Sequence, residues 1–360
     1  MNLYDIPSYM EDVNFVGKLD LPWEQLEDKT VLLSGATGMI GSFLVDVLME
    51  KNKREGLNCT IYALGRNQEK ASVRFPRYHD DKLFHFICHD VQSPLTLAEV
   101  EDAAYVFHLA SNTHPIQYST EPIDTILTNV VGAQNMLDFA TRRHASRFLF
   151  ASSVEIYGEN RGDVELFDED YCGNIDCNTL RAGYPESKRC GEALCQAYLK
   201  QHDLDFVIAR IARCYGPTMS FSDTKASSQF IKNAVAGENI VLKSAGTQVF
   251  SYTYVADAVS GLLTVLLRGQ KGEAYNVADP SSDVALKELA KIIADKTGNE
   301  TVFDVPKDEE AAGYSKATKA RMNGRKLMDV GWSPRYNIRS GLERTIDILR
   351  EVGGNGFVSH

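Results

Sequence analysis

Short apolar runs alternate with longer amphipathic stretches from Thr30 onward, and this rhythm constrains the fold more than any other feature of the chain. The apolar runs include TVLLSG, CTIYALG, LFHFICHD, AAYVFHLAS and RFLFASS, and amphipathic stretches such as residues 39–50 and 123–140 lie between them. Runs this apolar suit strands buried on both faces, and a helix after each strand returns the chain to a parallel neighbour. The sequence therefore predicts an α/β fold with a doubly wound parallel sheet.

The same rhythm divides the chain into three parts. Residues 1–28 precede the first strand and are expected to pack along the outside as an N-terminal extension anchored by Trp23. Residues 29–215 contain the repeated strand and helix units of the main domain. Residues 216–360 loosen into loops, short strands and separate helices. They are predicted to form a smaller, mainly substrate-binding C-terminal lobe, with some segments returning to the main sheet.

Composition excludes several classes of function. The net charge of -11 argues against nucleic acid as a partner, because such binding needs a clustered positive surface. No run of about 18 apolar residues is available to span a bilayer. The start, MNLYDIPSYMEDVNF, lacks the basic and apolar stretches of a secretory signal, so a cytoplasmic protein is expected. The seven cysteines contain no CxxC pair and are expected to be reduced thiols, with no metal site.

A glycine-rich turn, GATGMIG, follows directly after the first apolar run. Glycines let the backbone approach a pyrophosphate, and the free N–H groups and positive dipole end of the following helix attract its charge. The motif alone also fits a tight turn that binds nothing, but strand, turn and helix arrive in the order of a Rossmann-type NAD(P)-binding domain. The predicted contacts in the turn are Gly35, Thr37, Gly38, Met39, Ile40 and Gly41.

The end of the second strand bears on which nicotinamide cofactor binds. An acidic residue there would hold the ribose hydroxyls of NAD, but Gly65 takes its place and Arg66 follows. Arg66 favours NADP over NAD because its guanidinium can pair with the 2′-phosphate, although a solvated loop arginine explains it equally well. His108 is expected to serve packing rather than catalysis. Further cofactor contacts are expected at Asp90, Val91, Leu109, Ala110 and Ser111.

A serine, a tyrosine and a lysine are candidates for acid–base chemistry. Ser153 ends the fifth apolar run, and Tyr184 and Lys188 are spaced i, i+4 on one face of a predicted helix. Tyrosine titrates near pH 10, so a base at neutrality needs a shift of about three units, or roughly 4 kcal/mol, which an ammonium and the cationic nicotinamide can supply. We expect Tyr184 to be the base, Lys188 its activator and Ser153 the hydrogen-bond partner of the substrate oxygen. Read alone, the YxxxK spacing also fits a buried tyrosine beside an exposed lysine.

Taken together, the motifs resemble the extended short-chain dehydrogenases of the NAD-dependent epimerase/dehydratase family, which act on nucleotide sugars. The resemblance covers about residues 30–350 and rests on GATGMIG, HLAS, Asn129 in TNVVGAQNML, SSVEIYG, YPESK, RIARCYGP and SYTYVADAVSGL. It implies that the cofactor takes hydride from C4 of the sugar while Tyr184 removes the hydroxyl proton, leaving a transient 4-keto sugar. It also implies that Asn129, Tyr184 and Lys188 contact the cofactor, and that two copies pair through helices near 123–140 and 184–200.

The fate of the keto sugar stays open between epimerisation and decarboxylation. Glu155 resembles a catalytic glutamate of the 4,6-dehydratases and UDP-glucuronate decarboxylases that simple 4-epimerases usually lack. Val154 stands where the dehydratases have an aspartate, and valine cannot protonate a departing hydroxyl, so dehydration is disfavoured. GPTMSFSD and SSQFI resemble the decarboxylases. Their arginine before YV is Phe250 here, and their asparagine before YGP is Arg213.

The substrate contacts follow from the same resemblance. Arg213 is expected to supply the cation missing at Phe250 and to bind a phosphate or a sugar carboxylate, although a structural ion pair explains it equally well. Lys225, Ser228 and Arg321 resemble positions of the substrate lobe that touch the nucleotide. Two other functions remain open: an NADPH-dependent nucleotide-sugar reductase, and a catalytically silent NAD(P)-binding protein, against which the intact acid–base residues argue.

Overall fold

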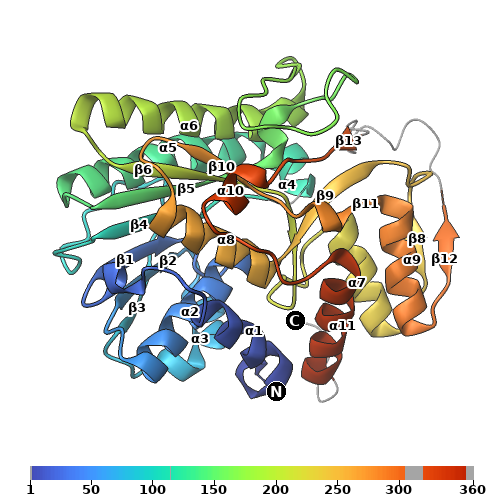
Figure 1. Cartoon of the computed structure of the whole chain (residues 1–360), viewed down its shortest axis with the longest axis horizontal. Coiled ribbons are helices and arrows are strands. Elements are labelled where there is room, and N and C mark those ends of the chain that lie inside the picture. Colours follow the sequence, from blue (N-terminus) through green and yellow to red (C-terminus); the bar gives the residue numbers. More distant parts are fainter. Residues whose placement is uncertain (1, 114, 305–318, 354–360) are drawn as a thin grey trace.

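A computed structural model describes residues 2–113, 115–304 and 319–353 (Figure 1). Its centre is a sheet of seven parallel strands. In chain order the strands are β1 Thr30–Ser34, β2 Thr60–Gly65, β3 Phe84–Cys88, β4 Tyr105–His108, β5 Arg147–Ser153, β6 Phe206–Ile211 and β10 Ala274–Val277. They lie in the order β10-β6-β5-β4-β1-β2-β3, so the direction of winding reverses between β1 and β4. The predicted doubly wound sheet is confirmed.

Helices cover both faces of this sheet, as Figure 1 shows with α5 and α6 above it and α2 below it. The covering helices are α5 Pro122–Arg142 and α6 Gly183–His202 on one face, and α1 Pro7–Gly17, α2 Met39–Glu55 and α8 Val255–Arg268 on the other. Alternate residues of β1 point to opposite faces. Leu32 joins the apolar cluster that includes α5, whereas Val31 and Leu33 join the cluster that includes α2 and α8.

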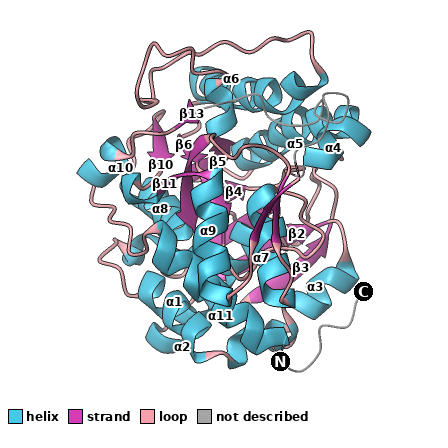
Figure 2. Cartoon of the chain, turned by 90° about the vertical axis from the view of Figure 1, so that its right-hand side faces the viewer, coloured by secondary structure: helices cyan, strands magenta, loops and turns pink. Residues whose placement is uncertain are grey.

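The C-terminal lobe is built around a second, smaller sheet, and Figure 2 shows its helices α7, α9 and α11 close together. Its strands are β7 Arg213–Tyr215, β9 Val249–Tyr254, β11 Asp283–Ala285 and β13 Lys319–Ala320, with β8 Ile240–Leu242 and β12 Thr301–Phe303 forming a separate pair. Its helices are α7 Ala226–Ala236, α9 Leu286–Thr297, α10 Arg325–Asp329 and α11 Ile338–Gly353. Two short helices, α3 Gln68–Arg74 and α4 Pro115–Thr120, lie outside this lobe.

The chain crosses between the two parts on both sides of residue 215. β10 comes from the C-terminal part of the chain, yet it pairs with β6 at the edge of the main sheet, with Ala274 opposite Ile208. The helix α8 packs on the main sheet as well. In the other direction, β7 leaves the main sheet directly after β6 and pairs with β9 in the lobe. The two parts of the chain therefore exchange segments along the line where they meet.

The N-terminal extension packs against the helices α2 and α8 and buries one face of α1. Tyr9 of α1 is fully buried, and so is Asp12. The Asp12 carboxylate accepts a hydrogen bond from Tyr254 at 2.7 Å and pairs with Arg344 of α11 at 2.7 Å. Trp23 is almost completely buried, as expected of an anchor. The residues around Asp12 do not indicate that its carboxylate is buried, because its partners lie more than half a chain away in the sequence.

Within the described residues, no helix combines the length and apolarity needed to cross a membrane. Those residues also contain no group of three or more histidine, cysteine, aspartate or glutamate side chains that could hold a metal ion. All seven cysteines are free thiols.

Candidate active site

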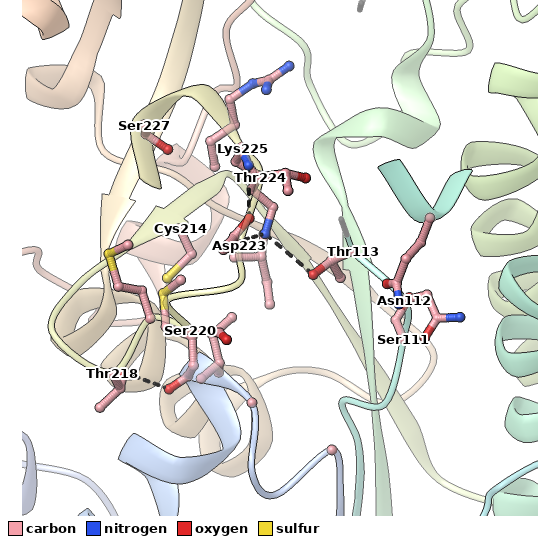
Figure 3. Close-up of a pocket in the computed structure, with 18 of the residues that line it drawn as sticks. Ser111, Asn112, Thr113, Cys214, Thr218, Ser220, Asp223, Thr224, Lys225 and Ser227 are labelled. Carbon is pink, nitrogen blue, oxygen red and sulfur yellow. Dashed lines mark hydrogen bonds and ion pairs between the residues drawn. The ribbon is translucent and has the colours of Figure 1, made fainter. Parts of the chain in front are cut away.

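A cleft of about 1720 Å³ lies at the carboxyl ends of the main strands. Ser34 at the end of β1 is opposite Leu64 of β2 and His108 of β4, so the loops that follow these strands meet at one edge of the sheet. In a doubly wound sheet this edge, at the point where winding reverses, is where ligands bind. The C-terminal lobe closes the other side of the cleft through the segment 217–230 (Figure 3).

The glycine turn forms the floor of the cleft and leaves room for a phosphate group. Gly35 has φ +72°, and a Cβ there would lie 2.7 Å from the backbone nitrogen of Ala110. A Cβ on Gly41 would lie 2.3 Å from the carbonyl oxygen of Gly35. The free N–H groups of the first turn of α2 start at this place. The turn therefore fits a dinucleotide pyrophosphate, and all its predicted contacts line the cleft: Gly35, Thr37, Gly38, Met39, Ile40 and Gly41.

Two cations lie where the cleft passes the end of β2. Arg66 is half-exposed, donates to Asn112 Oδ1 at 3.2 Å and lies 3.7 Å from Asp124. Lys70 of α3 lines the same part of the cleft, and burial together with the nearby charge of Arg66 lowers its pKa. The other cofactor contacts expected from the strand ends also line the cleft: Asp90, Val91, Leu109, Ala110 and Ser111.

Two of the singled-out residues lie beneath the cleft and do not line it. Asn129 is fully buried, accepts a hydrogen bond from Ser111 at 2.7 Å and donates to Ser187 at 2.9 Å. It therefore positions a cofactor-facing loop against α6, and no contact of its own with a cofactor is open to it in this arrangement. His108 is buried against Ser34 Oγ, 2.8 Å from its Nδ1, and burial lowers its pKa to about 3. A neutral, buried His108 serves packing, in line with the expectation.

Ser153, Tyr184 and Lys188 converge on the wall of the cleft beside the glycine turn. Burial raises the pKa of the Tyr184 phenol to about 12, and its hydrogen bond with Ser153 opposes part of that rise. Burial lowers the pKa of Lys188 to about 7, and its Nζ donates to the Ala151 carbonyl at 2.9 Å. The Lys188 Nζ lies 6.0 Å from the centre of the Tyr184 ring. The phenol therefore needs a further positive charge nearby before it can act as a base.

Glu155 follows this group in the short 3-10 helix Val154–Tyr157 and is held by two arginines. Its carboxylate accepts from Arg181 at 2.7 Å and lies 3.7 Å from Arg213. The Arg213 guanidinium also stacks on Phe250, 3.8 Å from the ring centre. Both sequence interpretations of Arg213 thus have support, because the side chain lines the cleft and makes an ion pair.

Sequence reasoning missed two residues that line the cleft beside Tyr184. Tyr118 of α4 stacks on the Tyr184 ring, with 4.9 Å between ring centres, and the Arg181 guanidinium lies 4.8 Å from the centre of the Tyr118 ring. Arg181 stands three positions before Tyr184, and this spacing was a usable signal. No motif in the residues around Tyr118 indicated its role, because its position depends on how α4 packs against α5 and the turn before α6.

The substrate lobe brings only part of its predicted set to the cleft. Lys225 lies opposite the loop after β4, with its Nζ 3.3 Å from Thr113 and 3.2 Å from Asp223 (Figure 3). Ser228 is buried on the inner side of α7 and does not line the cleft, whereas Ser227 does, because successive residues of a helix point about 100° apart. Of these two serines, Ser227 is therefore the one that faces the cleft, and substrate binding by Ser228 stays a prediction.

Arg321 is also outside the cleft. It pairs with Asp283 at 2.7 Å and with Glu165 at 3.4 Å, and so joins β11 to the loop after β5. The carboxylate of Asp283 is mostly buried, and one guanidinium that satisfies it has little freedom to reach a nucleotide. Its predicted role in substrate binding is therefore corrected to a structural ion pair.

Comparisons with known proteins agree with this arrangement. Residues 31–278 match the NAD dependent epimerase/dehydratase family. The chain is 35% identical over 315 residues to UDP-glucuronic acid decarboxylase 5 of Arabidopsis thaliana, covering 87% of this chain and 86% of the relative. It is 32% identical to UDP-glucuronic acid decarboxylase 1 of Xenopus tropicalis, covering 90% of this chain and 72% of the relative.

Among solved structures, UDP-glucuronic acid 4-epimerase of Bacillus cereus, in complex with UDP-glucuronic acid and NAD, has the same fold. The TM-score is 0.76 at 20% identity, and the match covers 90% of this chain and 99% of that one. The family match spans more than half of the chain and includes the glycine turn, Ser153, Tyr184 and Lys188. The chain belongs to the NAD-dependent epimerase/dehydratase family.

Proposed function

We propose that this enzyme oxidises C4 of a nucleotide-linked hexuronic acid and then releases the C6 carboxylate as carbon dioxide. The observation that carries the proposal is the convergence of Ser153, Tyr184 and Lys188 on one wall of a cleft that also contains the glycine turn. Oxidised NAD or NADP, held by the glycine turn, would supply a hydride acceptor for C4 and would give the hydride back before the product leaves. The protein is therefore neither oxidised nor reduced over a complete turnover.

The first step is proton removal by Tyr184. Its phenolate accepts the C4 hydroxyl proton, and Ser153 donates a hydrogen bond to the oxygen that becomes a ketone. Because burial holds the pKa of Tyr184 at about 12, the step depends on cations that stabilise phenolate. Lys188 is one such cation once an anionic ligand raises its own pKa from about 7. Asn129 contributes indirectly, by holding Ser111 and Ser187 in place.

Decarboxylation follows from the position of the ketone. A 4-ketone lies β to a C6 carboxylate, so the electron pair of the C5–C6 bond can move to C5 and the C4 oxygen while neutral carbon dioxide leaves. A proton then adds to C5, and hydride returns to C4. Position 154, where the dehydratases have an aspartate, is a buried valine. A valine side chain cannot protonate a departing hydroxyl, so dehydration is disfavoured. The similarity to UDP-glucuronic acid decarboxylases supports this ending over epimerisation.

The preference for NADP belongs to the same proposal. Arg66 and Lys70 both line the cleft past the end of β2, and Gly65 brings no carboxylate to this place. A 2′-phosphate would relieve the repulsion between the two cations. The wild type should have a lower dissociation constant for NADP than for NAD, and Arg66→Gln should bring the two constants closer together. Equal constants for NAD and NADP in the wild type and in Arg66→Gln would contradict the preference.

A homodimer and a cytoplasmic location complete the proposal. Ile123, Ile126 and Leu127 of α5 are exposed, and so is Leu180 shortly before α6. An apolar group of this kind on α5 is consistent with pairing through α5 and α6. Light scattering should give the mass of two chains, and Ile123→Glu should give that of one. Free thiols suit a reducing compartment such as the cytoplasm.

The test of the reaction is a panel of UDP-, dTDP-, CDP- and GDP-sugars, including UDP-glucuronate, incubated with the purified holoenzyme. Mass spectrometry of the products separates the outcomes. Loss of the mass of carbon dioxide from UDP-glucuronate is expected. An unchanged mass with altered retention would make the enzyme an epimerase, and net consumption of added NADPH would make it a reductase. Bound cofactor without any product would mean that the chain is a catalytically silent NAD(P)-binding protein.

A further inference from the structure

The cleft beside Tyr184 contains two guanidinium groups and one carboxylate. Arg181 and Arg213 come from different elements, the first just before α6 and the second at the start of β7, and both pair with Glu155. Arginine stays protonated in proteins. One carboxylate can neutralise at most one of the two guanidinium groups, so at least one positive charge at this end of the cleft has no counter-charge from the trio.

Neither guanidinium has all its donors satisfied. Arg181 Nη1 and Arg213 Nε are buried and have no hydrogen-bond partner among the residues that the structure describes. A buried donor on a charged group that lacks a partner costs free energy, and it usually indicates that a partner is absent. A ligand that accepts hydrogen bonds and carries negative charge would satisfy both these donors and the excess positive charge.

Aromatic rings fix both guanidinium planes. Arg213 stacks on Phe250 at 3.8 Å, and Arg181 lies 4.8 Å from the centre of the Tyr118 ring. Rings on one side of a guanidinium keep water away from that side and leave its edge available to a planar acceptor. Tyr118 also covers the ring of Tyr184. Tyr118, Arg181 and Tyr184 all line the cleft, so the Arg181 guanidinium lies on the same wall as the proposed base.

We propose that Arg181 and Arg213 together bind the C6 carboxylate of the sugar and so select hexuronic acids over neutral hexoses. This inference rests on the proposed function for the nature of the substrate. A carboxylate fits better than the diphosphate because Arg181 is three residues before Tyr184 and Glu155 is two residues after Ser153, which places the arginines at the reacting end of the cleft. Two forks of donors match the planar geometry of a carboxylate. When carbon dioxide leaves, both arginines return to Glu155.

The experiment measures binding in the Tyr184→Phe holoenzyme, which removes turnover. Calorimetry gives dissociation constants for UDP-glucuronate and UDP-glucose, which differ only at C6. The parent should bind UDP-glucuronate at least tenfold more tightly. Arg181→Gln and Arg213→Gln should each weaken UDP-glucuronate at least tenfold and change UDP-glucose less than twofold. Arg213→Lys, which keeps the charge without the fork, should fall between the parent and Arg213→Gln.

Arg339→Gln is the matched control, because Arg339 is exposed on α11 and pairs with its helix neighbour Glu343. Cofactor content and melting temperature show that each variant is folded. Equal weakening of both ligands would move the arginines to the diphosphate, and no weakening of either would make the trio structural; each result overturns the inference. The proposed function fails separately, if the wild type binds UDP-glucuronate with the expected preference and yields no decarboxylated product.

Discussion

The cofactor side and the sugar side of the cleft are built in different ways. On the cofactor side, most contacts come from the residues directly after β1, β2, β3 and β4, and the parallel register alone brings them to one edge. On the sugar side, Arg213 comes from β7, Lys225 from the start of α7 and Tyr118 from α4. A side chain on the first side is placed by its position along a strand. On the second side it is placed by the packing of loops that lie far apart in the sequence.

The largest expected effect belongs to the group that joins the two sides. Tyr184→Phe removes the proton acceptor, so kcat on UDP-glucuronate should fall by about a thousandfold, within the range that general acid–base groups contribute. Cofactor content should stay at the wild-type level, because the ring remains. Stopped assays with product analysis give kcat, and absorbance gives the bound cofactor. A kcat within tenfold of the wild type would assign the base to another residue.

Gly41→Val tests the cofactor side alone. A Cβ there would lie 2.3 Å from the Gly35 carbonyl, so the backbone of the turn must shift. We expect the dissociation constant for the dinucleotide to rise by about a hundredfold, the loss of two or three hydrogen bonds to phosphate. Gly17→Ala is the control, because nothing lies within 4 Å of a Cβ at that position. Unchanged cofactor binding in Gly41→Val would show that the turn carries no phosphate.

Lys188 gives the cofactor side a dependence on pH. Its pKa is about 7 in the folded protein and about 10.4 in an unfolded chain, so between these values the unfolded state holds one more proton. The free energy of unfolding of the cofactor-free protein should therefore rise with pH above 7, by up to about 1.4 kcal/mol per unit. Lys188→Met should remove this rise. Urea titrations from pH 7 to 9 measure it, and parallel curves for both proteins would refute the assignment.

The smallest effect distinguishes two neighbours on the sugar side. Ser227 lines the cleft and Ser228 does not. Ser227→Ala should raise KM for the nucleotide sugar by about two- to fivefold, since a single neutral hydrogen bond contributes about 0.5–1.5 kcal/mol. Ser228→Ala should leave KM within twofold. The reverse pattern would mean that α7 is rotated when substrate is bound, and would restore the prediction made from sequence.

The contrast between the two sides also explains what the sequence could predict. The sheet, the glycine turn and the pair Tyr184 and Lys188 follow from local periodicity and fixed spacing, which the amino-acid order encodes directly. Sequence could not distinguish Ser228 from Ser227, because a shift of one residue along a helix turns a side chain by about 100°. The position of the Arg321 side chain is set by its ion pair with Asp283, and no local sequence pattern predicts that partner.

The burial of Asp12 has a consequence for how the protein is made. Its partner Tyr336 follows 324 residues later in the chain. At typical rates of synthesis, this separation corresponds to roughly tens of seconds between the emergence of the Asp12 carboxylate from the ribosome and that of Tyr336. The end that leaves the ribosome first must therefore wait for the last helix. A chain truncated before α11 would lack Arg344 and would leave the buried Asp12 carboxylate without its cation. Such a chain should be less stable and should be degraded faster in cells.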